Sequence, residues 1–554
     1  MKNNSILVFI TCLLILGCSK AKDAATVTPP ALAIKVSTIY LNTIAFDNTV
    51  YGTTVQPLLK VQFSQPVKQG TVATAISLKD AGGVTEAITV SLSNHDSVLL
   101  IQPVSALKNL SKYFFKITTA LQSASGGGLS NGIDKNFITQ IDSANKFPVI
   151  SDSLLLDKIQ QQTFKYFWDL GHPVSGLARE RNTSGDIVTA GGSGFGIMSI
   201  VTGINRNFIT RTEGLARMQT IVGFLKNTAQ KVHGAFPHWM NGATGAIVPF
   251  SSKDDGADLV ETAYLMQGLL TARQYFNGGD AGETNLRNDI NILWNGVEWN
   301  WFRQNNQDVL YWHYSNMYAW DMNVKIQGWN ECLITYVLAA SSTTHTVPDS
   351  VYKSGWAKGS AFVNGNSYYN YTLPLGPELG GPLFFSHYSF LGINPNGLTD
   401  SYGNYTTQTK NHTLINYSYC VANPQNNYGY SSSCWGLTAS DIQDGYNASS
   451  PTSDVSVIAP TAAISSLPYT PAESMKALHF FYYTLGDKLW GEYGFYDAFS
   501  LKNVWFANST LAIDQGPIIV MIENYRTGLL WKLFTSCPEV KAGMLKLGFK
   551  APYL

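Results

Sequence analysis

The sequence predicts a small β-sandwich followed by a large, mainly α-helical domain. The first observation is a hydrophobic pattern of period two over residues 34–142, interrupted by glycine-containing turns. The second is a change to helical spacing over residues 151–554, after a short linker near residues 143–150. The third is the length of 554 residues, which exceeds what one ordinary hydrophobic core supports.

The composition narrows the class of ligand. The chain has 37 basic and 37 acidic residues, so it lacks the basic excess that is usual in nucleic-acid binders. Charged residues make up 13% of the chain, against about 25% in an average protein. Aromatic residues reach 12%. Such a surface suits an exported protein that handles neutral ligands such as sugars. The alternative is that the aromatic side chains fill a large helical core.

The N-terminus has the three regions of an export signal: Lys2, an apolar run that ends at Leu16, and the small-residue ending LGC, which closes at Cys18. This ending resembles a bacterial lipobox, in which Cys18 becomes the lipidated first residue. The apolar run is shorter than the roughly 20 residues of a membrane span. We expect a signal peptide over residues 1–18, a flexible tether over residues 19–33, and a lipid anchor in the bacterial outer membrane, facing the periplasm or the exterior. An ordinary cleaved signal peptide is the alternative.

Three alternating runs predict the β-sandwich over residues 34–142. In each run, apolar side chains occupy every second position: Leu59, Val61 and Phe63; Ile88, Val90 and Leu92; and Tyr113, Phe115 and Ile117. Short strands of this kind, separated by turns, are typical of a sandwich of about 100 residues. The motifs FSQPV and YFFKI resemble those of bacterial Ig-like modules, and that resemblance implies a spacer or adhesion role.

Helical spacing continues from the linker to the C-terminus. The helical segments are residues 154–170, 211–229, 258–276, 284–302, 324–341, 399–419, 471–485 and 513–535. Many helices joined by long loops predict a helical barrel with a cleft built from loops, although spacing alone is equally consistent with another large helical array. Of the four cysteines in this part, Cys420 and Cys434 flank a polar loop and could pair in an oxidising compartment. The cysteine spacings do not fit a zinc site.

The first acidic cluster is DDGADLVE, which contains Asp254, Asp258 and Glu261. Hydrolysis of a glycosidic bond requires two carboxyl groups, one that donates a proton and one that activates water or attacks. If a helix begins near Asp258, these three side chains lie along one side of its first turn. The alternative is that Asp258 and Glu261 form a capping box, which satisfies free backbone N–H groups at the helix start. The spacing does not fit an EF-hand calcium loop.

The second cluster, residues 310–340, combines aromatic and acidic side chains. Aromatic faces stack on sugar rings and their polar ends bind hydroxyl groups, so we expect substrate contacts from Trp312, His313, Tyr314 and Trp320. Glu331 begins an apolar run, and an apolar setting would raise its pKa and keep a proton available for general acid catalysis. The alternative is that Glu331 only makes a favourable interaction with a helix dipole in a first turn.

Further candidates are isolated in sequence. Asp514 in IDQGP precedes an apolar helix, where an aspartate is often only an N-cap. His238 and Trp239 could line a substrate subsite, as could His233, although a packing role fits the histidines equally well. Glu180 and Asp186 are weaker acidic candidates. No set of residues predicts a metal site, a serine-hydrolase elbow or a phosphate loop.

These motifs, taken together, resemble those of a known family. The stretches FWDLGHPVSGL, GFGIMSIVTGINR, DDGADLVETAYLMQGLL, LYWHYS, GWNECLITYVLA and IDQGPIIVMIENYRTGLLW occur in the order found in bacterial glucoamylase-like hydrolases, glycoside hydrolase family 144, which include endo-β-1,2-glucanases. The resemblance covers residues 151–535. It implies an (α/α)6 barrel, no metal cofactor, and hydrolysis of β-1,2-linked glucans with inversion. It also implies that Glu331 is the general acid and that Asp258, Glu261 and Asp514 are acidic residues of the cleft. The loop GLARERN departs from the family's acidic pattern, which leaves the role of Glu180 open.

The leading hypothesis is therefore an enzyme that cleaves β-1,2-glucan. One alternative is a hydrolase of another glucan. Two others are a glycan-binding lipoprotein without catalysis and an adhesion or structural lipoprotein. The presence of several candidate catalytic carboxylates favours the enzyme, because a protein that only binds glycan would not need all of them. We expect a monomer that needs no cofactor and has no nucleic-acid partner.

Overall fold

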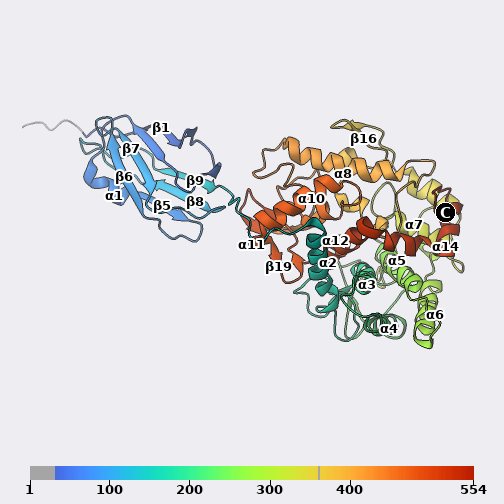
Figure 1. Cartoon of the computed structure of the whole chain (residues 1–554). Coiled ribbons are helices and arrows are strands. Elements are labelled where there is room, and N and C mark those ends of the chain that lie inside the picture. The colour runs from blue at the N-terminus through green and yellow to red at the C-terminus, as the bar shows by residue number, and fades with distance from the viewer. Residues whose placement is uncertain (1–30, 360–361) are drawn as a thin grey trace, which may run out of the picture. The chain divides into compact units, whose positions relative to one another are not determined.

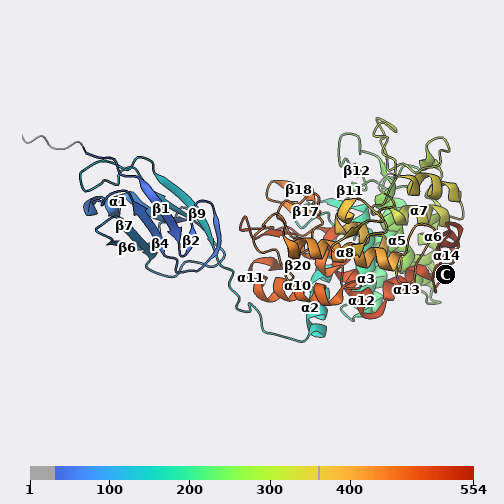
Figure 2. The same ribbon diagram turned by 90° about the horizontal axis from the view of Figure 1, so that it is seen from above.

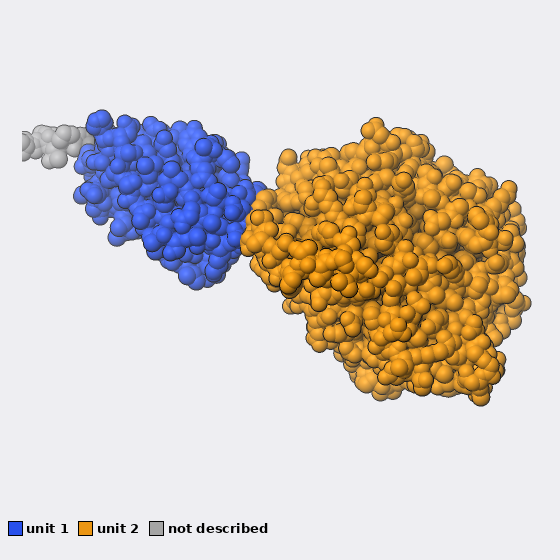
Figure 3. Space-filling model, in the orientation of Figure 1, with its two compact units in different colours: residues 1–140 blue, residues 141–554 orange. Residues whose placement is uncertain are grey.

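The computed structural model describes residues 31–359 and 362–554. The predicted signal peptide 1–18, the lipidation site Cys18 and nearly all of the predicted tether 19–33 lie outside these residues. The chain divides into two compact units, Met1–Gln140 and Ile141–Leu554 (Figure 3). No helix in the described part of the chain combines the length and the apolar character needed to cross a membrane.

Unit 1 contains two β-sheets (Figure 1). One sheet has, in spatial order, β2 (Ile44–Ala45), β1 (Val36–Leu41), β4 (Leu59–Phe63), β7 (Val98–Pro103) and β6 (Ile88–Ser93). The other has β3 (Val50–Thr53), β9 (Ile133–Thr139), β8 (Lys112–Ile117) and β5 (Ile76–Asp80). Side chains from both sheets form a single hydrophobic core, which is the packing of a β-sandwich.

The period-two runs are strands, as predicted. In β4, every second side chain is buried, from Leu59 to Phe63, and β8 buries Tyr113, Phe115 and Ile117 in the same way. Successive side chains of a strand point to opposite faces, so this alternation places one face in the core and leaves the other in water. The N-terminal region is thus built mainly of strands, with the short helix α1 (Val72–Ala75) between two of them.

Unit 2 is built from interior and outer helices. The interior helices, whose side chains are buried nearly all round, are α3 (Ala190–Asn205), α5 (Leu259–Tyr275), α7 (Leu333–Ser341), α9 (Pro460–Ile464) and α12 (Ala512–Thr527). The outer helices, which bury one face, are α2 (Asp152–Trp168), α4 (Arg211–Asn227), α6 (Ala281–Asn295), α8 (Tyr405–Ala422) and α10 (Pro471–His479). Helix α3 packs against both α5 and α12, and these three lie near the middle of the unit (Figures 1 and 2). The short helices α13 (Leu529–Thr535) and α14 (Pro538–Lys546) follow α12.

The predicted helical segments contain helices, but some are shorter than expected. Within 324–341 only α7 is helical, because the chain turns before it, and Gly328 there has φ 78°. That value lies in the left-handed region, which glycine adopts without steric cost. Within 513–535, α12 ends at Gly528, which also has a left-handed φ, and α13 then begins. Glu331 therefore lies in a turn rather than in a helix.

The spacing did not predict α3, because its N-terminal half, AGGSGFG, reads as a loop. Tertiary packing explains the glycines. A Cβ atom at Gly194 would lie 2.1 Å from the carbonyl oxygen of Tyr264, and one at Gly268 would lie 2.2 Å from that of Gly194. Helices α3 and α5 thus approach so closely that only glycine fits at their crossing.

Cys420 and Cys434 are both buried, and in the structure both are free thiols. Burial raises the pKa of the Cys420 thiol to about 12, so that this group is unreactive near neutral pH. The disulfide that their spacing allowed is absent from the structure.

Candidate active site

Candidate catalytic carboxyl groups lie at the N-terminal ends of interior helices. Asp258 directly precedes α5, Glu331 lies in the turn before α7, and Asp514 is in the first turn of α12. Partial positive charge at a helix N-terminus favours acidic groups. Tyr388, which precedes the short helix η7 (Ser389–Leu391), lies among them: burial raises its pKa, and the charges of Asp514 and Glu331 raise it further. The fold thus brings together carboxyl groups that are far apart in the sequence.

A two-stranded pairing joins the first acidic cluster to the aromatic cluster. Strand β13 (Ala257–Asp258) pairs with β14 (His313–Tyr314), so that Asp258 stands opposite His313. Similarly, β10 (Ile187–Thr189) pairs with β11 (Trp239–Asn241), and the N–H of Ala190 donates to the carbonyl of His238 at 3.1 Å. These pairings place His238 and His313 beside the start of α5.

Asp258 is fully buried, and donors surround its carboxylate. Oδ1 accepts the backbone N–H groups of Val260 and Glu261, both at 2.9 Å, which makes Asp258 the N-cap of α5. Oδ2 accepts Nε1 of Trp312 and pairs with Nδ1 of His238, each at 3.2 Å. Burial alone would raise the pKa of Asp258, but the hydrogen bond from His238 and nearby charges hold it below its usual value. Asp258 is therefore both a structural cap and an ionised group.

Glu261 does not complete the capping box. Instead, its Oε2 accepts the N–H of Gly191 at 2.7 Å and the hydroxyl of Thr189 at 3.2 Å, both from the start of α3. Burial, opposed by the nearby charge of His238, raises the pKa of this carboxyl group. Capping of α5 explains the contacts of one oxygen of Asp258. Capping does not explain the position of Glu261.

Glu331 has the environment of a general acid. Burial raises its pKa to about 7, and the charges of Asp258 and Glu261 contribute to the rise. Its backbone carbonyl accepts the hydroxyl groups of Ser389 and, at 3.5 Å, Tyr264, which fix the turn that carries the side chain. Glu331 lies two residues before α7, which begins at Leu333, and is therefore at the N-terminal end of the helix but not in its first turn. A carboxyl group with a pKa near neutrality can hold a proton and release it during a reaction.

His238 and Asp254 complete the acid–base group. Burial lowers the pKa of His238, but Glu261, Asp258 and Asp254 outweigh burial and raise it to about 9. Burial and the charge of Asp258 raise the pKa of Asp254 to about 7. His313 lies 3.5 Å from Asp254, and burial lowers its pKa. A cationic His238 therefore balances part of the negative charge of the surrounding carboxyl groups.

Ligand atoms of His238, Asp254 and Asp258 lie within 4.8 Å of one another, a spacing that a metal ion could bridge. The sequence did not indicate this group. His238, however, is hydrogen bonded to Asp258 and carries a proton near neutral pH. A metal ion would have to displace that proton, because a ligating histidine is neutral.

Of the predicted aromatic contacts, Trp239 is half-buried. Phe250, which is 49% exposed, stacks on His238 with ring centroids 4.1 Å apart and contacts Trp239 edge-on. Trp312 is held by its bond to Asp258. No sequence motif singles out Phe250, because exposure and stacking depend on the tertiary fold.

Two other predicted aromatic residues are engaged in packing. Trp320 contacts the rings of Trp301, Phe302, Tyr311 and Tyr314. Tyr314 also contacts Trp301 edge-on. His233 stacks on the same Trp301 ring. These contacts explain the positions of Trp320, Tyr314 and His233 by packing, and substrate contact stays a prediction for all three.

A second acidic group surrounds Asp514. The N-cap of α12 is Leu511, so the interpretation of Asp514 as an N-cap is wrong. Asp497, between β20 (Gly494–Phe495) and β21 (Phe499–Ser500), lies within hydrogen-bonding reach of Asp514. The N–H of Asp441 donates to Asp497 at 2.7 Å. No motif indicated Asp497 or Asp441, because each lies in a loop or short strand without a recognisable pattern.

The two weaker candidates, Glu180 and Asp186, each contact a basic side chain. Glu180 accepts from Arg181 at 2.8 Å, and Arg181 also binds Asp441 at 3.1 Å. Asp186 pairs with His172 at 3.2 Å. Glu180 thus belongs to the edge of the second acidic group, and Asp186 lies apart from it, in a hydrogen bond with His172.

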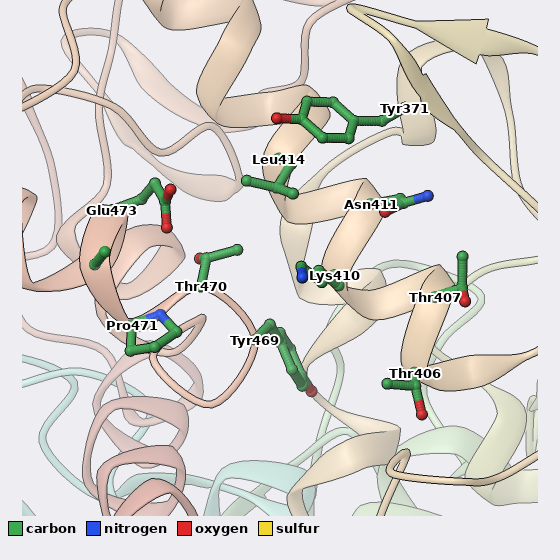
Figure 4. Close-up of a pocket in the computed structure, with 11 residues that line it drawn as sticks. Tyr371, Thr406, Thr407, Lys410, Asn411, Leu414, Tyr469, Thr470, Pro471 and Glu473 are labelled. Carbon is green, nitrogen blue, oxygen red and sulfur yellow. The ribbon is translucent and has the colours of Figure 1, made fainter.

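A separate cavity of about 630 Å³ lies between α8 and the start of α10 (Figure 4). Its lining residues include Tyr371, Lys410, Thr470 and Glu473. Glu473 is the acidic residue of this lining, whereas hydrolysis of a glycosidic bond requires two carboxyl groups. This cavity is therefore not the candidate hydrolytic site.

Two family models match the chain. One, described as "Putative glucoamylase", matches residues 323–538, and the other, described as a bacterial Ig-like domain, matches residues 23–139. An exo-β-1,2-glucooligosaccharide sophorohydrolase (non-reducing end) of Parabacteroides distasonis is 46% identical over 432 residues, which cover 74% of this chain and 60% of that protein. The chain thus spans only about 60% of the length of this curated relative.

Solved structures show the same similarity. A "putative glucoamylase" from Bacteroides uniformis is 55% identical, with a TM-score of 0.73, over 74% of this chain and 100% of that one. An endo-β-1,2-glucanase from Chitinophaga pinensis, in complex with sophorotriose and glucose, is 50% identical, with a TM-score of 0.71, over 73% of this chain and 100% of that one.

Proposed function

Because the chain belongs to the family of bacterial glucoamylase-like hydrolases, glycoside hydrolase family 144, we propose that it is a glycoside hydrolase that cleaves β-1,2-glucan or its oligosaccharides. The relatives named for activity on β-1,2-linked glucose chains support this substrate. The observation that carries the proposal is Glu331, a carboxyl group whose pKa is about 7 beside the ionised Asp258.

In the proposed mechanism, Glu331 donates its proton to the glycosidic oxygen as the bond to the anomeric carbon breaks. A water molecule attacks that carbon from the opposite face and loses a proton to a carboxylate, which gives inversion. The donor is neutral before the step and anionic after it, and the cationic His238 near the acidic cluster favours that change. The exposed ring of Phe250 and the neighbouring Trp239 supply ring faces for sugar units.

We further propose that unit 2 is an (α/α)6 barrel. The interior helices α3, α5, α7, α9 and α12, which are buried nearly all round, and the outer helices, which bury one face, support an inner and an outer ring. A barrel would explain why the candidate carboxyl groups meet at the N-terminal ends of the inner helices.

The N-terminal sequence supports a proposal about location. We propose a monomeric lipoprotein, anchored to the bacterial outer membrane through Cys18 and facing the periplasm or the exterior. The Ig-like unit and the short tether would then hold the catalytic unit away from the membrane.

Product analysis tests the substrate. We expect residues 20–554 to release short β-1,2-linked oligosaccharides from linear β-1,2-glucan and nothing from starch, β-1,3-glucan or cellulose oligomers. A ladder of sizes would indicate endo action, and disaccharide alone would indicate exo action. Cleavage of a different glucan only would discard the proposed substrate, and binding without any cleavage would favour a glycan-binding lipoprotein.

A further inference from the structure

We propose that Asp497 is a positioning residue that shares one proton with Asp514, so that the two buried carboxyl groups carry a single negative charge between them. The proposal deepens the proposed function and rests on it for its kinetic test. Its spectroscopic test does not depend on the substrate.

Each of the two side chains has one buried carboxyl oxygen without a donor among the described residues. Each is only 2% exposed. Oδ1 of Asp497 and Oδ2 of Asp514 are buried, and neither accepts a hydrogen bond from the residues that the structure describes. The carboxyl groups themselves lie within hydrogen-bonding reach of each other. Two ionised groups would leave both buried oxygens unsatisfied and would repel, whereas one proton between them satisfies both.

The protein holds both groups in place. Oδ2 of Asp497 accepts the N–H of Asp441 at 2.7 Å, and the N–H of Asp497 donates to the carbonyl of Ser509 at 2.9 Å. The backbone carbonyl of Asp514 accepts the hydroxyl of Thr461 at 2.9 Å. These bonds restrain both residues, so that neither carboxyl group readily turns toward solvent.

The nearby cation does not neutralise a second charge. Nη1 of Arg181 lies 3.1 Å from Asp441, and its Nε lies 2.8 Å from Glu180, so that two carboxylates already share its charge. The titratable groups that face the pair are Glu180 and Arg181, Asp441 on β17 (Ala439–Ile442), Tyr446 on β18 (Gly445–Ala448), Tyr388 before η7, and Tyr166 on α2. Two further negative charges here would be poorly compensated.

The pKa values agree with this geometry. Burial, followed by the charge of Asp497, raises the pKa of Asp514 well above its usual range. Burial raises the pKa of Asp497 to about 6. One proton therefore remains on the pair at neutral pH, as in other buried carboxyl pairs whose like charges cannot both ionise.

Infrared spectroscopy at pH 8 tests the shared proton directly. At this pH, Glu331 and Asp254, whose pKa values are about 7, are mostly ionised. We expect a carbonyl band of a protonated carboxyl group in the wild-type protein and in Glu331→Gln. The band should weaken in Asp497→Asn and in Asp514→Asn, because each variant replaces the shared proton with an amide N–H, whereas any contribution of Glu261, whose pKa burial also raises, should remain. A wild-type spectrum without the band, or an unchanged band in Asp497→Asn, would overturn the proposal.

Kinetics test the positioning role. An amide at position 497 can donate to Asp514, so Asp497→Asn should retain most of the wild-type kcat. Asp497→Ala offers no donor and should lower kcat about ten- to hundredfold with little change in KM, the loss expected for one unsatisfied buried polar group. Equal losses in the two variants, with both folded, would show that the hydrogen bond does not position Asp514. Absence of glucan hydrolysis in the wild type would refute the proposed function instead and leave the infrared result standing.

Discussion

Replacing Glu331 with glutamine should reduce β-1,2-glucan hydrolysis by about 10²- to 10⁴-fold, the usual contribution of a general acid. Glutamine has nearly the same shape but has no proton to give to the leaving oxygen. Burial in the turn before α7 raises the pKa of Glu331 to about 7, so the wild-type group is protonated over much of the acidic and neutral range. The measurement is kcat with linear β-1,2-glucan, together with substrate binding by calorimetry.

Glu473→Gln is the matched control, because Glu473 lines the separate cavity beside α10. We expect it to leave kcat nearly unchanged. The Glu331→Gln variant should fold and should still bind the glucan, since the substitution removes one proton and little volume. Near-normal turnover in this variant would refute the role of Glu331 as the acid.

Replacing Asp258 with asparagine should destabilise the protein by about 3–5 kcal/mol, the cost of removing one partner from a buried charged pair. The asparagine oxygen can still cap α5, but its NH₂ group would then face the donors on His238 and Trp312. The pKa of His238 should fall from about 9 toward its ordinary value, and kcat should drop on the order of a hundredfold. Urea unfolding and an NMR titration of His238 measure these effects.

The stability of the folded protein should depend on pH through His238. Because folding raises the pKa of His238 from 6.5 to about 9, its stabilising contribution is fully present below pH 6.5 and is lost as the pH rises through 9. In Asp258→Asn this pH dependence should shrink. Asp321→Asn, which breaks an exposed ion pair with Lys253, should cost less than about 1 kcal/mol. If the Asp258 variant behaved like that control, His238 would not depend on Asp258.

Much of the fold could be predicted because hydrophobic spacing is a local property. The runs through Leu59 and Tyr113 are strands, as their period predicts. Helix α3 could not be predicted in this way. Its glycines weaken a helix locally, and tertiary packing explains them: a Cβ atom at Gly194 would clash with α5 and one at Gly196 with Phe167 of α2. The break before Glu331 likewise depends on a turn at Gly328 inside an apparently helical segment.

Candidate site residues could be predicted from the sequence where they belong to a recognisable motif. The motifs around Asp258 and Glu331 singled out two residues that share one acidic environment in the structure. Asp497 has no such motif, since it lies in a loop and acquires its significance only from the buried oxygen of Asp514. The sequence also left a cap and a catalytic role as alternatives for Asp258. The structure shows that one carboxylate caps α5 with Oδ1 and binds His238 with Oδ2.

The pH dependence of kcat/KM on β-1,2-glucan tests most directly whether Glu331 is the acid. Because its proton must be present, we expect kcat/KM to fall about tenfold per pH unit above pH 7, the pKa of Glu331 being about 7. Asp254 has a similar pKa, so Asp254→Asn serves as the control and should retain this decline. A value of kcat/KM that stays constant up to pH 9, or a decline that disappears in Asp254→Asn, would contradict the assignment of Glu331.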